Sequence, residues 1–116
     1  MKELNLPHRD PIRFAKNIIS KEGDTYTVKV KFDTVPSLPM IVEAAAQSSA
    51  AFDDGSSKMG FLVTLKNIKQ IEKPSALEYE VKVTSGAQVD ALTYFSFEMF
   101  DDSLLVASGT FIIALQ

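Results

Sequence analysis

The sequence predicts an α+β protein of a single domain, residues 1–116, in which an antiparallel sheet wraps around one long central helix. Three observations support this prediction. The chain has 116 residues, a length that supports one hydrophobic core but not two. Its candidate elements follow the order strand, strand, helix and then four strands. The helix consists mostly of small residues, which lets a sheet approach it closely.

The first two strands are expected at residues 13–20 and 25–32. A turn-rich cluster, Lys-Glu-Gly-Asp at residues 21–24, separates them. In the second strand, apolar residues alternate with polar ones. A period of two sends successive side chains to opposite faces of a strand. We therefore expect a hairpin with one buried face.

A helix follows and is expected to run to about Phe52. Pro36 and Pro39 block strand pairing and favour a helix start, with Ser37 as the candidate N-cap. Residues 40–51 (Met-Ile-Val-Glu-Ala-Ala-Ala-Gln-Ser-Ser-Ala-Ala) carry small side chains on every face. A surface helix would show an apolar stripe opposite a charged face, so we expect this helix to be surrounded by protein.

The second half of the chain predicts strands only. Apolar and polar residues alternate in residues 77–84, and the Asp-Asp-Ser turn at residues 101–103 joins the last two strands as a hairpin. The expected strands are residues 59–71, 77–84, 92–100 and 104–115. Four aromatic residues of the expected strand 92–100 are predicted to lie in the core and at an interface: Tyr94, Phe95, Phe97 and Phe100.

The composition argues against several classes of partner. The formal net charge is −3, without a block of Lys and Arg, which argues against nucleic acid as a partner. No apolar run approaches the roughly 20 residues that span a bilayer, and residues 1–9 lack the apolar core of a signal peptide. The chain has no Cys, which excludes disulfides and thiolate metal sites. We expect a cytoplasmic protein that does not bind a membrane.

No metal or other cofactor is expected either. The paired acids Asp53-Asp54 and Asp101-Asp102 lie in predicted turns, where Asp is favoured for conformational reasons. The sequence places no cluster of His residues beside them, since His8 is the only histidine. These carboxylates are therefore interpreted as turn residues.

Two segments carry a resemblance to a known family: Leu-Pro-His-Arg-Asp-Pro at residues 6–11 and Leu-Pro-Met-Ile-Val-Glu-Ala-Ala-Ala-Gln at residues 38–47. They resemble the hotdog-fold 3-hydroxyacyl-acyl carrier protein dehydratases of fatty acid synthesis. These enzymes open with a similar Pro-His-Arg-x-Pro segment, and their central helix reads roughly Val-Glu-Ala-x-Ala-Gln. The resemblance implies a hotdog fold, a homodimer with sheets joined edge to edge, and a thioester ligand on acyl carrier protein or coenzyme A.

The resemblance also implies site residues. Glu43 matches the catalytic helix acid of the family, and Gln47 matches its glutamine. The family's histidine, in a Gly-His-Phe-Pro loop before the helix, abstracts the substrate's α-proton. The corresponding loop here, residues 32–39, contains neither Gly nor His. His8 fits the N-terminal motif instead, where we expect it to bond its own turn while Arg9 pairs with an acid.

Substrate contacts are expected from Gln47, Phe32, Asp33 and Pro36. Dehydration needs a base with a suitable pKa beside the thioester. Asp33 could act as that base only if it were buried. Two other interpretations of the helix polar groups stay open. The helix N-terminus could satisfy Glu43. Gln47 could orient Glu43, contact a ligand amide or serve as a buried amide that meets backbone.

Three functions remain open at this point. The first is an acyl-thioester-handling, dehydratase-like protein with altered or lost dehydration activity. The second is an acyl thioesterase in which the helix acid activates water. The third is a non-catalytic module that binds acyl groups or a carrier protein, or that is purely structural. An open pocket at Glu43 would favour the enzymes.

Overall fold

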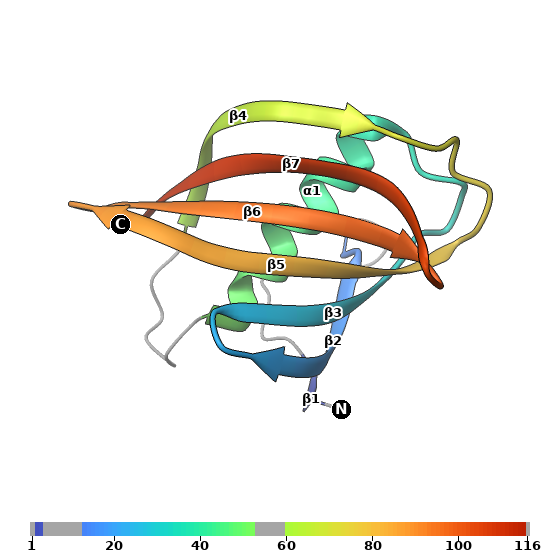
Figure 1. The fold of residues 1–116 in the computed structure, drawn as a ribbon, viewed down its shortest axis with the longest axis horizontal. Helices are drawn as coiled ribbons and strands as arrows, with labels where there is room; N and C mark the ends of the chain where they lie inside the picture. Colours follow the sequence, from blue (N-terminus) through green and yellow to red (C-terminus); the bar gives the residue numbers. More distant parts are fainter. Residues whose placement is uncertain (1, 4–12, 53–59, 116) are drawn as a thin grey trace.

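The computed structural model describes residues 2–3, 13–52 and 60–115, and they form one sheet and one helical segment (Figure 1). The helical segment consists of α1 (Leu38–Ser48) and the 3-10 turn η1 (Ser49–Phe52). The strands are β1 (Lys2–Glu3), β2 (Ala15–Glu22), β3 (Thr25–Lys31), β4 (Gly60–Gln70), β5 (Glu78–Val89), β6 (Leu92–Asp101) and β7 (Leu104–Leu115).

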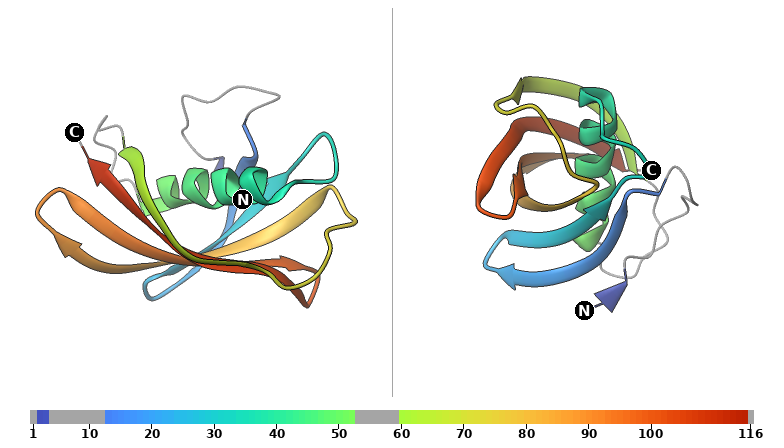
Figure 2. Two further views of the ribbon diagram at one scale, coloured as in Figure 1. Left: turned by 90° about the horizontal axis from the view of Figure 1, so that it is seen from above. Right: turned by 90° about the vertical axis from the view of Figure 1, so that its right-hand side faces the viewer.

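The seven strands form a single antiparallel sheet in the order β1-β2-β3-β5-β6-β7-β4. The sheet is strongly curved, and α1 lies in its concave face (Figure 2). The strand that follows the helix, β4, crosses to the far side of the sheet and pairs with the last strand, β7. The predicted α+β architecture, with a sheet wrapped around one helix, is confirmed.

The differences from the sequence prediction lie at the ends of elements. The two-residue β1 is not predicted, because it pairs with β2 through only two residues. β5 extends to Val89, beyond the predicted end at residue 84, because its last third pairs with the first residues of β6. The helix ends its α-helical part at Ser48, and the predicted last turn is 3-10 helix.

The helix begins where the prolines predict it. Ser37 occupies the N-cap position, but its side chain makes no capping hydrogen bond. Its carbonyl accepts the first helical hydrogen bond, from the Ile41 N–H at 3.0 Å. Pro39 lies in the first turn, where a missing N–H costs nothing. Proline geometry, rather than a side-chain cap, therefore sets this end of the helix.

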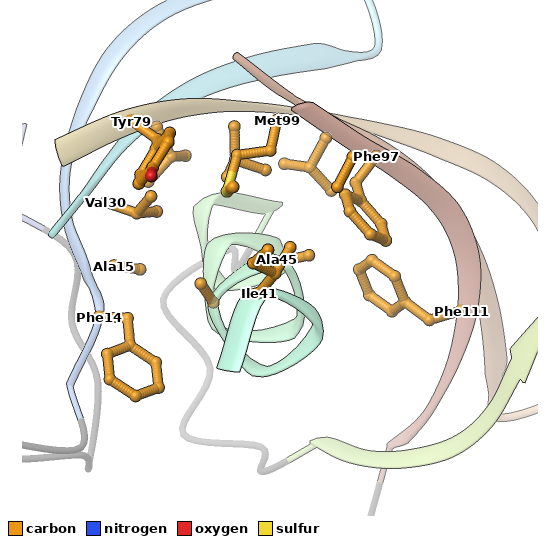
Figure 3. Packing of buried hydrophobic residues seen from close by; sticks show 14 of the residues in the cluster. Phe14, Ala15, Val30, Ile41, Ala45, Tyr79, Phe97, Met99 and Phe111 are labelled. Carbon is orange, nitrogen blue, oxygen red and sulfur yellow. The ribbon is translucent and has the colours of Figure 1, made fainter. Parts of the chain in front are cut away.

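The core lies between α1 and the concave face of the sheet (Figure 3). Ile41, Ala44 and Ala45 of the helix have no solvent exposure. Phe14 and Ala15 lie on one side of the helix, and Phe97 and Phe111 lie on the other (Figure 3). Phe95 and Phe97 are buried as expected, whereas Tyr94 is 37% exposed. The helix packs against the sheet as expected, but protein does not surround it on every side, because Pro39 is exposed and Glu43 is partly exposed.

An irregularity in β4 lies next to Ile68, which packs against this core. Asn67 has a positive φ of 54°, and the β4–β7 register shifts between Lys66 and Lys69. Ile68 then packs over Gly109 of β7. A Cβ at residue 109 would overlap Ile68 Cδ1 and would come within 3.0 Å of Phe97 Cε1. The close approach of these strands therefore requires glycine at this position.

Gly109→Ala is expected to lower the free energy of unfolding by about 1–3 kcal/mol, the usual cost of overpacking a core. Adding Ile68→Val removes the Cδ1 atom and should restore part of that loss. Urea unfolding of both variants measures the effect. A Gly109→Ala protein as stable as the wild type would contradict this packing.

A buried tyrosine holds the connection between β4 and β5. The Tyr79 hydroxyl donates to the Ala76 carbonyl at 2.7 Å and accepts from the Ala76 N–H at 3.0 Å. The Tyr79 side chain is 3% exposed. Desolvation by burial raises the pKa of its phenol above the ordinary value of 10.0. The neutral phenol is thus the form that the fold accommodates.

Tyr79→Phe is expected to cost about 1 kcal/mol at neutral pH, because both hydrogen bonds are lost. The unfolded chain releases the phenol proton at lower pH than the folded chain does. The contribution of the Tyr79 hydroxyl to the free energy of unfolding is therefore fully present below about pH 10. It falls as the pH rises through the raised pKa of the folded protein. Urea unfolding of both proteins across this range should show a flatter alkaline decline for the variant, whereas parallel declines would refute the assignment.

Candidate functional site

Glu43 and Gln47 lie one turn apart on α1, whose other residues are apolar except for Ser48 at its end. Residues four apart in a helix share a face. Glu43 is partly exposed, whereas Gln47 is only 3% exposed. A buried amide must satisfy its polar atoms inside the protein. The chemistry open to Glu43 and Gln47 therefore depends on the hydrogen-bond partners of the Gln47 amide.

The side-chain oxygen of Gln47 is bonded to the start of β2. Oε1 accepts hydrogen bonds from the Phe14 N–H at 2.8 Å and from the Ala15 N–H at 3.1 Å. Only the oxygen of an amide side chain can accept, so these two donors define its orientation. Its Nε2 then donates to Glu43 Oε1 at 3.3 Å. Gln47 thus makes both contacts that the sequence left as alternatives.

The two serines at the end of the helix bond to the helix itself. Ser48 Oγ donates to the Ala44 carbonyl at 2.7 Å, and Ser49 Oγ donates to the Ala46 carbonyl at 2.6 Å. Both hydroxyls therefore satisfy backbone acceptors one turn earlier. Glu43 and Gln47 stay the chemically relevant side chains of the segment.

The three candidates in the loop before α1 have different surroundings. Phe32 is 1% exposed, and its ring centroid lies 4.9 Å from Phe14 and 5.9 Å from Tyr79. Pro36 is buried, and Asp33 is exposed. The structure therefore brings Glu43 and Gln47 together, while Phe32 packs into the core. The burial on which Asp33 would depend as a base is not present.

Some residues singled out in the sequence lie outside the described residues, namely His8, Arg9, Asp53 and Asp54. Asp101 ends β6, and Asp102 adopts a positive φ of 54° in the turn to β7. Among the described residues, no group of three or more His, Cys, Asp or Glu could hold a metal ion. Within the same part of the chain, no helix is long and apolar enough to cross a membrane.

A surface hollow of about 250 Å³ lies away from the Glu43–Gln47 pair. It is lined by residues that include Thr27, Glu80 and Lys82. These residues alternate along β3 and β5 with the buried Val28 and Val81, so they face the convex side of the sheet. The hollow and the pair therefore lie on opposite faces of the sheet.

The sequence could not reveal the main-chain donors of Phe14 and Ala15. Every residue except proline carries a backbone N–H, so its use by a distant side chain leaves no mark in the amino-acid types. The only signal is Gln47 itself, a long polar residue on an enclosed helix. Such a residue requires partners, but the sequence does not name them.

No family model and no curated protein match the sequence. Solved structures do match. The dehydratase heterocomplex ApeI:P from Xenorhabdus doucetiae aligns with a TM-score of 0.78 and 12% identity, over 96% of this chain and 88% of the other.

Two further structures represent different chemistries. The dehydratase domain from the CurJ module of curacin polyketide synthase aligns with a TM-score of 0.72 and 14% identity, over 90% of this chain and 42% of that one. A mutant of the thioesterase PA1618 from Pseudomonas aeruginosa aligns with a TM-score of 0.67 and 11% identity, over 85% of this chain and 79% of that one. The chain has the hotdog fold, which dehydratases and thioesterases share.

Proposed function

We propose that the protein handles acyl thioesters and that Glu43 is its reactive carboxyl group. One observation carries the proposal: a partly exposed carboxylate, bonded to a buried amide, on a mostly apolar helix that packs against the concave face of the sheet. An acyl chain prefers apolar surroundings, and proton transfer near its thioester requires a placed acid or base. The similarity to dehydratases and thioesterases of the same fold supports this function.

The first reaction is elimination of water from a 3-hydroxyacyl thioester. Asp33 is exposed, so we assign both proton transfers to Glu43. Its carboxylate takes the α-proton, the carbon–oxygen bond to the hydroxyl breaks, and Glu43 returns the proton to the departing hydroxyl. The products are an enoyl thioester and water, and Glu43 is a carboxylate again.

The second reaction, thioester hydrolysis, needs the same group. Glu43 accepts a proton from water as the water oxygen attacks the thioester carbonyl. The carbon–sulfur bond then breaks, and the proton passes to the thiolate. The products are a carboxylic acid and a free thiol. Similarity to thioesterases is the observation that favours this second candidate. The choice between acyl carrier protein and coenzyme A as the carrier, and the expected cytoplasmic location, stay predictions.

The purified protein should convert at least one member of a panel of 3-hydroxyacyl, enoyl and saturated acyl thioesters. Mass spectrometry detects loss or gain of water, and a thiol assay detects hydrolysis. Because acid–base groups contribute about 10²–10⁴-fold, Glu43→Gln should lower the rate at least about a hundredfold.

Glu98→Gln is the matched control, because Glu98 is an exposed acid on β6. It should leave the rate unchanged. Turnover that survives Glu43→Gln would contradict the role of Glu43. A protein that converts no member of the panel would contradict both enzymatic functions and favour the non-catalytic module.

We also propose that two copies pair through β4. This eleven-residue strand is outermost in the sheet, at the edge opposite the two-residue β1 (Figure 1). Leu62, Val63 and Leu65 of β4 are 39%, 54% and 45% exposed. A long apolar edge strand pairs readily with another strand. The same strand of a second copy would cover both its backbone and these side chains.

The double variant Leu62→Lys, Leu65→Lys should shift the protein from twice the chain mass to the chain mass in light scattering after size exclusion. Lysine on an edge strand opposes pairing with a second sheet. Leu104→Lys changes an equally exposed leucine at the start of β7 and should leave the dimer intact. A wild-type protein that is monomeric would refute the pairing.

A further inference from the structure

Thr27 is a buried polar residue on the convex face of the sheet. It is only 9% exposed, although α1 covers the opposite, concave face (Figure 2). Ser20 of β2 and Lys82 of β5 lie directly beside it in the register of the strands. Within residues 13–52 and 60–115, the Thr27 hydroxyl makes no hydrogen bond. A buried polar group normally has a hydrogen-bond partner, so this hydroxyl indicates a place where a ligand binds.

The same threonine lines the surface hollow of about 250 Å³ on this face. A β-bulge borders the hollow, because the register of β2 and β3 shifts between Ile18 and Ser20. A bulge bends its strand and leaves one extra residue out of the pairing, here Ile19. Ile19 is 38% exposed and adds an apolar part to the lining. The volume suits a small molecule rather than a protein partner.

Two acidic residues of the lining lie at opposite corners of the hollow. Glu22 of β2 pairs in register with Thr25 of β3, and Glu80 of β5 pairs with Lys29 of β3. Thr25 and Lys29 lie two residues to either side of Thr27 on the same strand. Thr27 therefore lies between the two acids, one on each neighbouring strand. Both acids are exposed, so a ligand can reach them from solvent.

Two lysines beside the hollow are engaged with groups outside it. The Lys29 Nζ lies 3.8 Å from Glu78 Oε2, although Glu80 is the partner of Lys29 in register. The Lys82 Nζ lies 5.4 Å from the centre of the Phe100 ring. Neither Glu78 nor Phe100 lines the hollow. These contacts draw the ammonium groups toward other partners, so the charge of the hollow favours a cationic ligand.

We propose that the hollow binds a short linear polyamine. Its two terminal ammonium groups donate to the carboxylates of Glu22 and Glu80, and an inner amine donates to the hydroxyl oxygen of Thr27. Ile19 packs against the methylene groups of the ligand. Ammonium groups are donors only, which matches a site of carboxylate and hydroxyl acceptors. The site is separate from Glu43, so this proposal does not depend on the proposed function of that residue.

Spermidine and 1,8-diaminooctane together test the role of each group. The terminal nitrogens of the two compounds are equally far apart along the chain, but only spermidine has an inner amine. Titration of the nitrogen-labelled protein with either compound measures binding through the amide chemical shifts of Thr27 and its neighbours. Exposed ion pairs are weak and screened by salt, so we expect dissociation constants that lie in the millimolar range and rise with ionic strength.

Glu22→Gln and Glu80→Gln should each raise the Kd of both compounds by about threefold. Thr27→Val replaces the hydroxyl by a methyl group of similar size. It should raise the Kd of spermidine at least about fivefold and leave that of 1,8-diaminooctane within about twofold. Glu98→Gln is the matched control and should change neither Kd. Glu98 is an exposed acid of the same face, opposite Lys82, that does not line the hollow.

Thermal unfolding separates binding from folding. Thr27→Val removes an unpartnered buried hydroxyl from a strand, so its Tm should equal or exceed that of the wild type. Amide shifts that do not saturate, or that saturate away from the hollow, would overturn the proposal. An equal loss of binding in Glu98→Gln would also overturn it, because attraction by the net charge alone predicts that result. The same holds if Thr27→Val weakens both compounds alike.

Discussion

The enclosure of α1 by a curved sheet is the constraint on which the rest of this structure depends. Short side chains let a helix lie close to the concave face, and Ala44 and Ala45 are buried there with no exposed surface, beside the larger Ile41. Most of the helix surface is therefore committed to packing. Polar groups on this helix either bond back to it, as Ser48 and Ser49 do, or lie where Glu43 and Gln47 do.

The same enclosure explains why the site depends on the sheet. A buried amide without partners is costly, and so are buried backbone donors without acceptors. Gln47 and the N–H groups of Phe14 and Ala15 satisfy each other. These two hydrogen bonds hold the start of β2 against the helix. They also leave the amide nitrogen of Gln47 beside Glu43. These hydrogen bonds contribute both to stability and to the geometry of the site, so a change at Gln47 affects both.

Much of the fold could be predicted because its determinants are periodic. Alternation in β3 and β5, the prolines before α1 and the alanines within it are local patterns with direct structural meanings. The irregular features could not be predicted. The positive φ of Asn67 in β4 allows Ile68 to pack over Gly109. Gly109 lies in β7, far along the chain, so no local pattern in β4 indicates this contact. For the site, the sequence and its family resemblance indicated Glu43 and Gln47, but the main-chain partners of Gln47 emerge only from the folded chain.

The proposed function requires an acyl thioester to bind with its reacting atoms at Glu43, on the concave side of the sheet. A crystal structure of the wild-type protein with a thioether analogue of a 3-hydroxyacyl-coenzyme A tests this requirement. In this analogue a methylene group replaces the thioester carbonyl, so the carbon–sulfur bond cannot be hydrolysed. We expect the hydroxyl of the analogue to lie within hydrogen-bond distance of the Glu43 carboxylate, with Gln47 still bonded to Phe14 and Ala15. An analogue bound only in the hollow beside Thr27 and Lys82, or at no defined place, would contradict it.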